Sequence, residues 1–548
     1  MALGRHFPRG PVCMPADTSA QVNIRVGIDD ASVGQWRSLV AHLLREQGVG
    51  GSNPLCPTNF SAGRMRFGLN SRQASGSTPG IGTAVVLVCP VPFRDPVEVL
   101  QAFAGDPVLA FLDSAAADPR SRYSYLAVEP YTVLTAGPDG VRVDGHPVAG
   151  DPFTVLKAQM QPHRTAPEAG PVPFRGGAVG YLAYESARHV DRFPDPPKDP
   201  HAILEMVAGL YDVVFAFDLR RRQCWLLSSG LPEPSAKRRS RRAAARAQAV
   251  LARLPAVGEE IANIDWSVRG QWQAERPRAA VERAIARVID YIQAGDIFQA
   301  NLTQRMLAER PLGLDDAMLY RRLRAISPAP FAALLRCGPE LSVLSASPER
   351  FLGLSVDGRV ETRPIKGTRR RDANPAIDAA LARELVASAK DRAENLMIVD
   401  LMRNDLGRVC RVGSIEVPAL QGLETFASVH HLVSVVTGRL NDGLGPVDLL
   451  RACFPGGSIT GAPKIRAMEI IAELEARQRG ACFGSVFWIG DDGAMDSSIA
   501  IRTIVRTGNM LLAEAGGGIV ADSDPAAEYD EAILKLQPLL RALTGDRP

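Results

Sequence analysis

Short apolar blocks, bounded by turn residues, recur along the chain from about residue 84 onward. Blocks rich in Val, Ile and Leu are typical of β-strands, and turn signals between them, such as P-D-G at 138–140, favour antiparallel pairing. On this basis strands are predicted at 84–89, 107–114, 176–185, 211–217, 223–228, 331–336, 342–347 and 499–504.

Other segments carry helical periodicity. The stretch A-A-V-E-R-A-I-A-R-V-I-D-Y-I (279–292) spaces its apolar residues at helical intervals and stops at Gly295. A shorter helix is predicted at Pro96–Phe103. The alanine-rich sequence from Pro375 to Val409 predicts one long helix or a broken pair.

Two segments lack both patterns. Residues 1–80 mix Gly, Ser, Pro and Arg and predict either a disordered extension or a spurious translation of upstream DNA. The second reading rests on Gly51–Pro54, which GGT-TCG-AAT-CCC can encode, a match to a transfer RNA T-arm; the true start would then lie near Met65 or later. The basic run K-R-R-S-R-R (237–242) favours an exposed helical connector over nucleic-acid binding, because no aromatic residues interleave with the charges.

Composition narrows the class of protein. The chain has 548 residues, 46% of them hydrophobic and 22% charged, which is ordinary for a soluble globular protein. A net charge of +3 implies neither nucleic acid nor an anionic membrane as partner. No apolar run reaches the roughly 20 residues that cross a bilayer. The eight cysteines are scattered without a C-x-x-C pair, which favours reduced thiols and a cytoplasmic location.

Lys366 is the first candidate for chemistry. It lies in E-T-R-P-I-K-G-T-R-R-R (361–371), between an extended X-Pro step and a glycine that allows a turn. The four arginines of the stretch are expected to lower the pKa of the lysine, and only a neutral amine is a nucleophile. The alternative is a basic surface loop.

Acidic residues supply the second set of candidates. Glu349 ends a predicted buried strand, so it is either a protonated general acid or a partner of its neighbour Arg350.

Two carboxylate pairs are spaced three residues apart on predicted helices. Asp391 and Glu394 form one pair; Glu528 and Glu531, with Lys535 one turn further, form the other. Each pair is either a solvated helix face or half of a site for a hard cation such as Mg²⁺, which takes oxygen ligands.

Anion-binding candidates complete the set. Gly516–Gly518 offer backbone N–H groups without side chains, and P-G-G-S-I-T-G-A-P-K (455–464) is a glycine loop that enters a helix near Ala462. Arg502 is suited to clamp a carboxylate with two hydrogen bonds. His431 is either an acid–base group or a satisfied core histidine.

Together these stretches resemble the chorismate-utilising enzymes over about 107–540. Within that superfamily, P-I-K-G-T with Lys366 is similar to aminodeoxychorismate synthase component I, whereas anthranilate synthases have an alanine at that position. Gln299 stands where isochorismate and salicylate synthases have a lysine that activates water. The motifs that carry the resemblance are G-D-I-F-Q-A-N-L-T-Q-R, S-P-E-R-F, P-I-K-G-T, A-E-N-L-M-I-V-D-L-M-R-N-D-L-G-R, H-H-L-V-S, G-S-I-T-G-A-P-K, M-D-S-S-I-A-I-R-T and G-G-G-I-V-A-D-S-D-P-A-A-E-Y-D-E.

The resemblance implies an α+β fold of two packed antiparallel β-sheets flanked by helices, which the strand-rich pattern of 84–228 suits without defining the topology. It divides the chain into an N-terminal part, 81–265, and a chorismate-binding catalytic part, 266–548. It also implies Mg²⁺ as the cofactor. Four carboxylates would hold the metal: Glu394 and Glu531 directly, with Asp391 and Glu528 behind them.

The resemblance implies a covalent mechanism. Lys366 would attack ring C2 of chorismate while Glu349 protonates the departing 4-hydroxyl, and ammonia would then add at C4 to give 4-amino-4-deoxychorismate for 4-aminobenzoate and folate synthesis. The residues expected to contact the substrate are Arg502, Gly516, Gly517, Gly518, Thr460, Lys535 and Gln299, with His431 and Lys464 near them.

The resemblance also implies a separate glutaminase subunit as the source of ammonia, since the chain lacks the nucleophile-elbow cysteine of a glutamine amidotransferase. F-L-D-S-A (111–115) and S-R-Y-S (121–124) resemble a tryptophan-binding segment, regulatory or structural, with Asp113, Ser114, Arg122 and Tyr123 as its candidate contacts. Cys482 and Phe487 depart from the residues usual in relatives. The rival functions are anthranilate synthase component I and a non-catalytic binding subunit.

Overall fold

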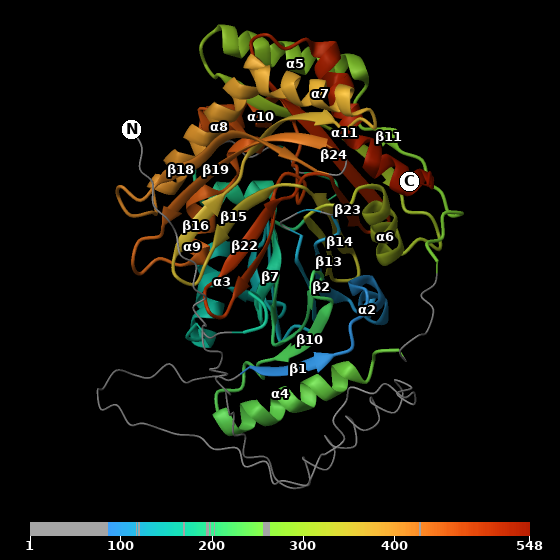
Figure 1. The fold of residues 1–548 in the computed structure, drawn as a ribbon, viewed down its shortest axis with the longest axis vertical. Helices are drawn as coiled ribbons and strands as arrows, with labels where there is room; N and C mark the ends of the chain where they lie inside the picture. Colours follow the sequence, from blue (N-terminus) through green and yellow to red (C-terminus); the bar gives the residue numbers. More distant parts are fainter. Residues whose placement is uncertain are drawn as a thin grey trace, which may run out of the picture. The chain divides into compact units, whose positions relative to one another are not determined.

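The computed structural model describes residues 86–547 except for short gaps at 117, 119–120, 168–169, 193–196, 198, 202, 256–262 and 427–428 (Figure 1). The expectation for residues 1–80 lies outside the described residues. Among those that are described, the strands form two antiparallel sheets of twelve strands each.

The first sheet joins strands from both ends of the described chain. Strand β20 (Gly461–Ala462) pairs with β12 at the side of the main order. The main order across the sheet is β1 (Leu87–Val91), β10 (Gln223–Ser228), β9 (Val213–Asp218), β3 (Tyr123–Val128), β2 (Val108–Asp113), β13 (Phe331–Cys337), β14 (Leu341–Ser347), β23 (Thr503–Thr507), β24 (Met510–Ile519), β12 (Gln299–Glu309) and β11 (Gln273–Ala274).

The second sheet is built in the same way. Strand β18 (Glu416–Thr425) pairs with β19 outside the main order. That order is β17 (Ile365–Arg370), β19 (Val429–Arg439), β16 (Arg359–Thr362), β15 (Arg350–Leu354), β22 (Met495–Ile499), β21 (Ser485–Gly490), β7 (Gly177–Leu182), β8 (Met206–Tyr211), β4 (Thr132–Gly137), β5 (Gly140–Val143) and β6 (His146–Val148).

Helices flank the sheets. Figure 1 shows α5, α7, α8, α10 and α11 gathered at the top of the view, and α4 beside β1 and β10 at the bottom. The α-helices are α2 (Pro96–Phe103), α3 (Pro152–Met160), α4 (Ala236–Leu251), α5 (Arg278–Gln293), α6 (Asp316–Ile326), α7 (Pro375–Ala387), α8 (Ala389–Gly407), α9 (Pro446–Cys453), α10 (Lys464–Glu475) and α11 (Pro525–Thr544). Short 3₁₀ turns are η1 (Gln161–His163), η2 (Tyr184–His189) and η3 (Gly457–Ile459).

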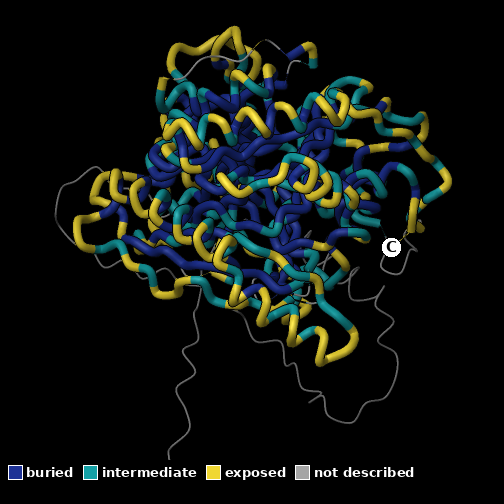
Figure 2. Tube along the Cα trace, turned by 90° about the horizontal axis from the view of Figure 1, so that it is seen from above, coloured by how far each residue is buried: buried dark blue, intermediate teal, exposed yellow. Residues whose placement is uncertain are grey.

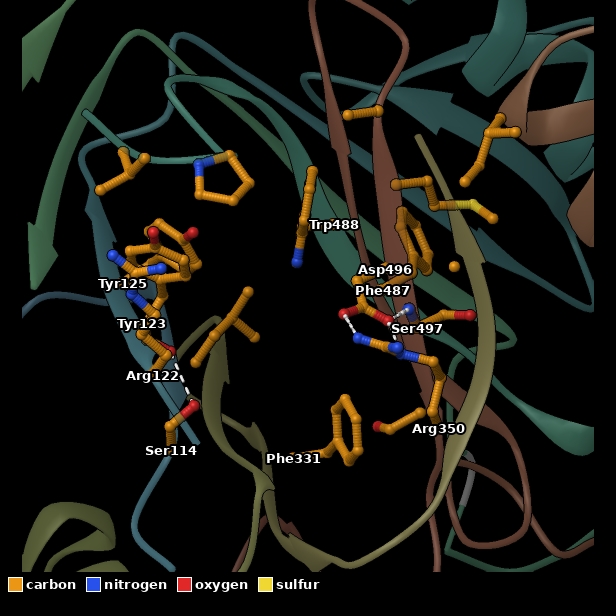
Figure 3. A pocket seen from close by; sticks show the side chains of 18 of the residues that line it. Ser114, Arg122, Tyr123, Tyr125, Phe331, Arg350, Phe487, Trp488, Asp496 and Ser497 are labelled. Carbon is orange, nitrogen blue, oxygen red and sulfur yellow. Dashed lines mark hydrogen bonds and ion pairs between the residues drawn. The ribbon is translucent and has the colours of Figure 1, made fainter. Parts of the chain in front are cut away.

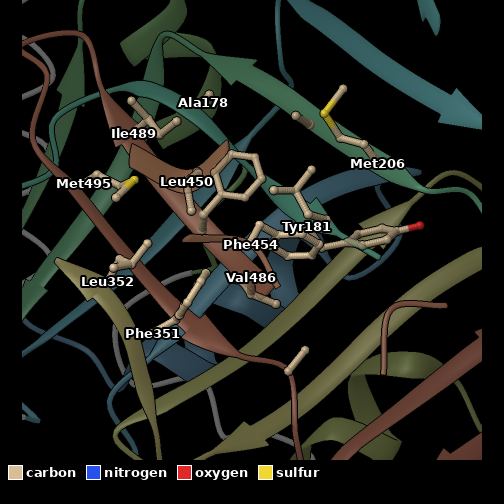
Figure 4. Close-up of a cluster of buried hydrophobic side chains, with 14 of the residues drawn as sticks. Ala178, Tyr181, Met206, Phe351, Leu352, Leu450, Phe454, Val486, Ile489 and Met495 are labelled. Atoms are coloured by element: carbon tan, nitrogen blue, oxygen red, sulfur yellow. The ribbon is translucent and has the colours of Figure 1, made fainter. Parts of the chain in front are cut away.

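The main core contains side chains from both sheets and from α3, α8 and α9. Figure 4 shows part of it, where Phe351 of β15 and Phe454 lie beside Tyr181 and Val486. A second cluster packs α5 and α10 onto β12. In Figure 2 the dark blue, buried segments lie inside a rim of exposed ones. Removal of this apolar area from water is the main driving force for the fold.

Most predicted elements are confirmed. Helix α2 and strand β10 have the predicted bounds, and α5 ends close to Gly295 as expected. The stretch 375–409 is a broken pair, since the Ser388 side chain accepts a hydrogen bond from the Asp391 N–H and starts a second helix, α8. The basic segment forms helix α4, and its Arg246 pairs with Glu129 and Asp212.

Three expectations were wrong in detail. Residues 211–217 do not form one strand, because the chain turns at Asp212 between β8 and β9. The helix after the 455–464 loop begins at Lys464, since Gly461–Ala462 pairs with β12 as β20. The stretch 499–504 is not continuous either: β22 ends at Ile499 in one sheet and β23 begins at Thr503 in the other.

Strands from before and after residue 265 alternate within each sheet. In the first sheet β2 pairs with β13, and in the second β7 pairs with β21. The proposed division at 265 therefore separates segments that share both sheets. Within the described part of the chain, every helix is too short or too polar to cross a bilayer.

Candidate active site

Lys366 lies on β17 opposite Leu432 of β19. Its side chain is only 13% exposed, and its Nζ lies 4.0 Å from Oε2 of Glu394 on α8. Strand β17 thus presents the lysine to a helix that carries two of the predicted metal-binding carboxylates. The alternative of an exposed basic loop is wrong.

The four arginines of the stretch around Lys366 are each paired with carboxylates, so their positive charges are compensated locally. Their expected effect on the lysine amine stays a prediction. Their partners are Glu424 for Arg363, Glu384 and Asp391 for Arg369, Asp372 for Arg370, and Asp378 for Arg371.

Glu349 lies in the connection between β14 and β15 and is buried. Burial raises the pKa of this carboxyl to about 7, against a hydrogen bond from Ser458, the positive charge of Lys366 and the Ile365 N–H. Its neighbour Arg350 pairs with Asp496 and Glu361 instead. The general-acid interpretation is therefore the one that the geometry favours, because the carboxyl is partly protonated near neutral pH and lies close to Lys366.

The carboxylates of α8 and α11 converge beside Lys366. Burial raises the pKa of Glu394, and the nearby charges of Asp391 and Glu528 act in the same direction, whereas Lys366 and Lys390 oppose them. Glu528 accepts hydrogen bonds from Lys390 Nζ at 3.3 Å and from Ser523 Oγ at 2.7 Å.

Glu531 pairs with Lys535 at 2.8 Å. Burial alone would raise its pKa, but Lys535, Lys390 and Lys366 lower it, so all three lysines face this acid cluster. Glu394, Glu528 and Glu531 therefore lie near the same lysines. That the two carboxylate pairs converge on one cation stays a prediction.

Asp391 is turned toward β17. It pairs with Arg369 at 3.3 Å, and its side-chain carbons pack against Gly367. Among the described residues, no three His, Cys, Asp or Glu side chains lie close enough to hold a metal ion by themselves. The carboxylates of this cluster nevertheless offer only oxygen donors, and lysine ammonium groups supply the positive charge beside them. This fits Mg²⁺, which accepts one or two protein carboxylates together with water and a substrate anion.

The glycines 516–518 belong to β24 and pair with β12. Pairing of β24 with β23 ends at Ala513, so within the described part of the chain β23 does not pair with the glycine segment. Lys535 Nζ donates a hydrogen bond of 2.9 Å to the Gly516 carbonyl. A Cβ on Gly518 would lie 1.8 Å from Nε2 of Gln299, so any larger residue here would force this amide to move.

Gln299 is 1% exposed, and its Oε1 has no hydrogen-bond partner among the described residues. A buried acceptor without a donor costs about 1–3 kcal/mol, which a ligand that donates a hydrogen bond would recover. Its position beside Gly518 agrees with the prediction of a substrate contact.

Arg502 lies in the connection between β22 and β23, where the chain passes from one sheet to the other. Its φ of +51° is left-handed, which is unusual for a residue with a side chain. The Arg502 carbonyl accepts a hydrogen bond of 3.0 Å from the N–H of Ala346, three residues before Glu349. Burial lowers its pKa, and no described carboxylate pairs with it. A desolvated guanidinium without a partner is suited to a substrate carboxylate.

Thr460 and His431 are both buried. Thr460 Oγ donates to the carbonyls of Gly456 and Gly457, at 3.2 and 3.3 Å, so it holds the loop that carries Ser458. Nδ1 of His431 lies 2.9 Å from Oγ of Thr368 on β17, two residues from Lys366. Lys464 donates to Asp405 at 2.6 Å and to the carbonyls of Cys453 and Pro455, which anchors the same loop.

A cavity of about 920 Å³ is lined in part by Arg350, the residue that follows Glu349. Figure 3 shows Tyr123 and Tyr125 on one side, Arg350 and Asp496 on the other, and Trp488 between them. All four residues expected from the tryptophan-like segment line it: Asp113, Ser114, Arg122 and Tyr123.

Most polar groups of that segment are engaged within the protein. Asp113 accepts hydrogen bonds from Ser124, Tyr320 and Arg324. Ser114 donates to the Tyr123 carbonyl at 2.7 Å, and Arg122 pairs with Asp218 at 2.8 Å.

Residues 110–541 match the family described as chorismate binding enzyme. The chain belongs to this family. The match covers every candidate catalytic, substrate and metal residue named above.

Curated relatives from two branches of this family are about equally similar to the chain. Aminodeoxychorismate synthase component 1 of Klebsiella aerogenes is 42% identical over 428 residues, which cover 77% of this chain and 90% of that protein. Anthranilate synthase component 1 of Streptomyces coelicolor is 41% identical over 431 residues, or 77% of this chain and 81% of that protein. Overall identity therefore does not separate the two reactions.

A solved structure confirms the predicted fold class. The chain is similar to anthranilate synthase component I of Streptococcus pneumoniae, with a TM-score of 0.69, 31% identity and coverage of 77% of this chain and 92% of that one. The isochorismate synthase MenF of Escherichia coli shares the fold at a TM-score of 0.62 and 17% identity, covering 84% of this chain and 95% of that one. The α+β fold of two packed antiparallel sheets is thus that of the chorismate-utilising enzymes.

The two departures from the usual sequence lie in different surroundings. Phe487 of β21 lines the 920 Å³ cavity. Cys482 is buried, with its Sγ 3.7 Å from the Thr503 carbonyl, just after Arg502. Of the two residues, Cys482 is therefore the one that contacts the segment carrying Arg502, a candidate substrate residue.

Sequence reasoning missed Ser458 and Lys390. Ser458, within the glycine loop, donates to Glu349, and nothing in the sequence pattern joins those two segments. Lys390 precedes Glu394 by one helical turn, so the i, i+4 spacing was an available signal for it.

Proposed function

We propose that this protein catalyses the amination of chorismate to 4-amino-4-deoxychorismate. The observation that carries the proposal is the position of the Lys366 amine. It lies between Glu349, whose raised pKa keeps it partly protonated near neutral pH, and the carboxylate of Glu394 with its neighbours. A buried amine beside a general acid supports covalent catalysis at that position.

In the first step, Lys366 releases its ammonium proton to solvent, and the neutral amine attacks C2 of the ring. The double bonds shift, the C4–O bond breaks, and Glu349 gives its proton to the departing hydroxyl, which leaves as water. The raised pKa of Glu349 supports this role, because the carboxyl retains its proton near pH 7.

In the second step, ammonia attacks C4 and the double bonds shift back. The C2–N bond to Lys366 breaks, the lysine leaves as a neutral amine, and the new C4 ammonium group returns one proton to Glu349. The net change is chorismate plus ammonia giving aminodeoxychorismate plus water. Two allylic displacements replace a single difficult one.

Substrate anions would be held by Arg502 and by the glycine segment of β24. Arg502 and the backbone of Gly516–Gly518 suit the carboxylates of chorismate, and Lys535 and Gln299 lie beside those glycines. Glu394 and Glu531, with Glu528 behind them, would hold Mg²⁺. When bound, the metal would supply positive charge for the ring carboxylate.

We further propose that ammonia comes from a separate glutaminase subunit. The chain covers 90% of a relative named as component 1 of aminodeoxychorismate synthase, which supports a two-component enzyme. A high concentration of free ammonia should replace the partner in part.

Product identity tests the proposal. Purified protein is incubated with chorismate, MgCl₂ and ammonium salt, and the product is detected as 4-aminobenzoate after addition of a lyase that eliminates pyruvate. We expect aminodeoxychorismate from the wild type, a loss of at least about 10³-fold in Lys366→Ala, and no change in Lys237→Ala, an exposed lysine of α4. Fluorescent anthranilate as the main wild-type product would instead establish the anthranilate synthase reaction, and absence of product with intact chorismate binding would establish a non-catalytic subunit.

A further inference from the structure

Lys390, near the start of α8, has its ammonium group among the candidate metal carboxylates. Its Nζ lies 3.3 Å from Oε1 of Glu528 on α11. Burial opposes its charge, yet the carboxylates of Glu528, Glu394 and Glu531 outweigh that effect and raise its pKa. A single lysine thus interacts with three acids from two helices.

The charges of this cluster balance without any metal ion. Three carboxylates, Glu394, Glu528 and Glu531, face three ammonium groups, Lys366, Lys390 and Lys535. A divalent cation that enters a balanced cluster meets three positive charges at close range. Binding of the cation is therefore favoured when at least one ammonium group moves away.

The three lysines differ in what else they do. Lys366 is the proposed nucleophile, and Lys535 also donates to the Gly516 carbonyl. Among the described residues, the Lys390 ammonium group donates its hydrogen bond to Glu528, and its side chain is 50% exposed. Lys390 is therefore the ammonium group that can swing into water without leaving a buried backbone carbonyl unpaired.

We propose that Lys390 is an internal counter-ion of the metal site, bound to Glu528 when no divalent cation is present and displaced into solvent when one binds. The inference rests on the proposed Mg²⁺ site. It gives Lys390 a positioning role, since it keeps α8 and α11 together in the metal-free protein and weakens the affinity for Mg²⁺.

The test compares Lys390→Met, which keeps a long apolar stem without the charge, with two controls. Lys390→Arg retains the positive charge. Arg403→Met removes a charge from the far part of the same helix, where Arg403 pairs with Asp400 at 2.8 Å. The dissociation constant for Mg²⁺ is measured by isothermal titration calorimetry without chorismate, and that for Mn²⁺ by electron paramagnetic resonance.

We expect Lys390→Met to bind both ions about tenfold more tightly than the wild type, because the cluster gains one net negative charge. Both controls should stay within about twofold of the wild type. In EDTA, Lys390→Met should melt at a lower temperature, and its gain in melting temperature on addition of Mg²⁺ should exceed that of the wild type. The second measurement also shows that the variant is folded.

An unchanged or weaker Mg²⁺ affinity in folded Lys390→Met would overturn the inference and leave the proposed reaction intact. A wild type that binds no divalent ion while it still forms aminodeoxychorismate would overturn the inference and the proposed metal together. If the divalent-ion affinities are as expected but the enzyme forms anthranilate, the role of Lys390 is supported and the proposed reaction is refuted.

Discussion

At the scale of the residue, Glu349 must carry a proton for the 4-hydroxyl to leave as water. Its pKa of about 7 is set mainly by burial. A general acid loses activity as pH rises through its pKa, so we expect kcat/KM to fall about tenfold per pH unit above pH 7. Initial rates at saturating ammonia, measured from pH 5.5 to 9, provide the profile.

Glu349→Gln supplies the control for that profile. It keeps the shape and the hydrogen-bonding capacity toward Ser458 but has no proton to give. The variant should lose at least about 10²-fold in rate, and its residual activity should lack the limb near pH 7. A limb that persists in the variant would assign the titration to another group.

At the scale of the element, the contact between β17 and α8 determines how far Lys366 lies from Glu394. Gly367 has a φ of +78°, and an added Cβ would lie 2.8 Å from Leu385 Cδ1 and 2.9 Å from Asp391 Cβ. Gly367→Ala should push α8 away from β17, lower the free energy of unfolding by more than about 1 kcal/mol, and reduce kcat. Urea denaturation and steady-state kinetics measure both effects.

Gly358→Ala is the matched control, since Gly358 has a φ of +83° and nothing within 4 Å of the added Cβ. It carries the backbone strain alone, about 1 kcal/mol, and should leave kcat unchanged. Equal behaviour of the two variants in stability and kcat would show that the spacing of β17 and α8 does not affect the chemistry.

Strand β15 connects Glu349 to the cavity that Arg350 lines. Arg350, next to Glu349, lines the cavity and ties β15 to Asp496 of β22 and Glu361 of β16. Arg350→Met should cost roughly 2 kcal/mol in the free energy of unfolding, because Asp496 loses its ion pair and Glu361 keeps only Arg363, at 3.8 Å. We also expect kcat to fall more than KM rises, as Glu349 loses its fixed position.

Arg359→Met is the control for Arg350→Met. Arg359 lies on β16, lines the same cavity and is exposed. Its loss should leave both stability and kcat near the wild-type values. If Arg350→Met shows the same mild behaviour, the strand connection does not hold Glu349 in place.

At the scale of the whole molecule, the two sheets interleave strands from both halves of the sequence. β13 pairs with β2, and β21 pairs with β7, so neither half has a complete sheet. A fragment of residues 266–548 contains all the proposed catalytic residues, yet we expect it to show no cooperative unfolding transition and no activity. A cooperative urea transition in the isolated fragment would contradict this.

The sequence predicted local elements well and long-range neighbours poorly. Periodicity is a local property, so α2 and β10 could be delimited from it. The carboxylate partners of the arginines around Lys366, such as Glu424 and Asp378, come from segments that only the fold brings near. Arg502 was assigned to a strand because its neighbours alternate, whereas the chain changes sheets there.

The site was predicted mainly through the ordered motifs, because their chemistry is local even when their neighbours are not. Glu394, Glu528 and Glu531 were expected together on the basis of the family resemblance and of oxygen-ligand chemistry. Lys390 and Ser458 were not, since their roles depend on the packing of α8 on α11 and of the glycine loop on Glu349.

The most direct test of the account is a search for the covalent bond to Lys366. Protein is mixed with chorismate and Mg²⁺ without ammonia, quenched in acid and mapped by peptide mass spectrometry. We expect an adduct of chorismate less one water on Lys366, discharged by ammonia and missing from Lys366→Ala. Absence of the adduct, together with wild-type rates of aminodeoxychorismate formation in Lys366→Ala, would contradict the proposal that this amine is the nucleophile.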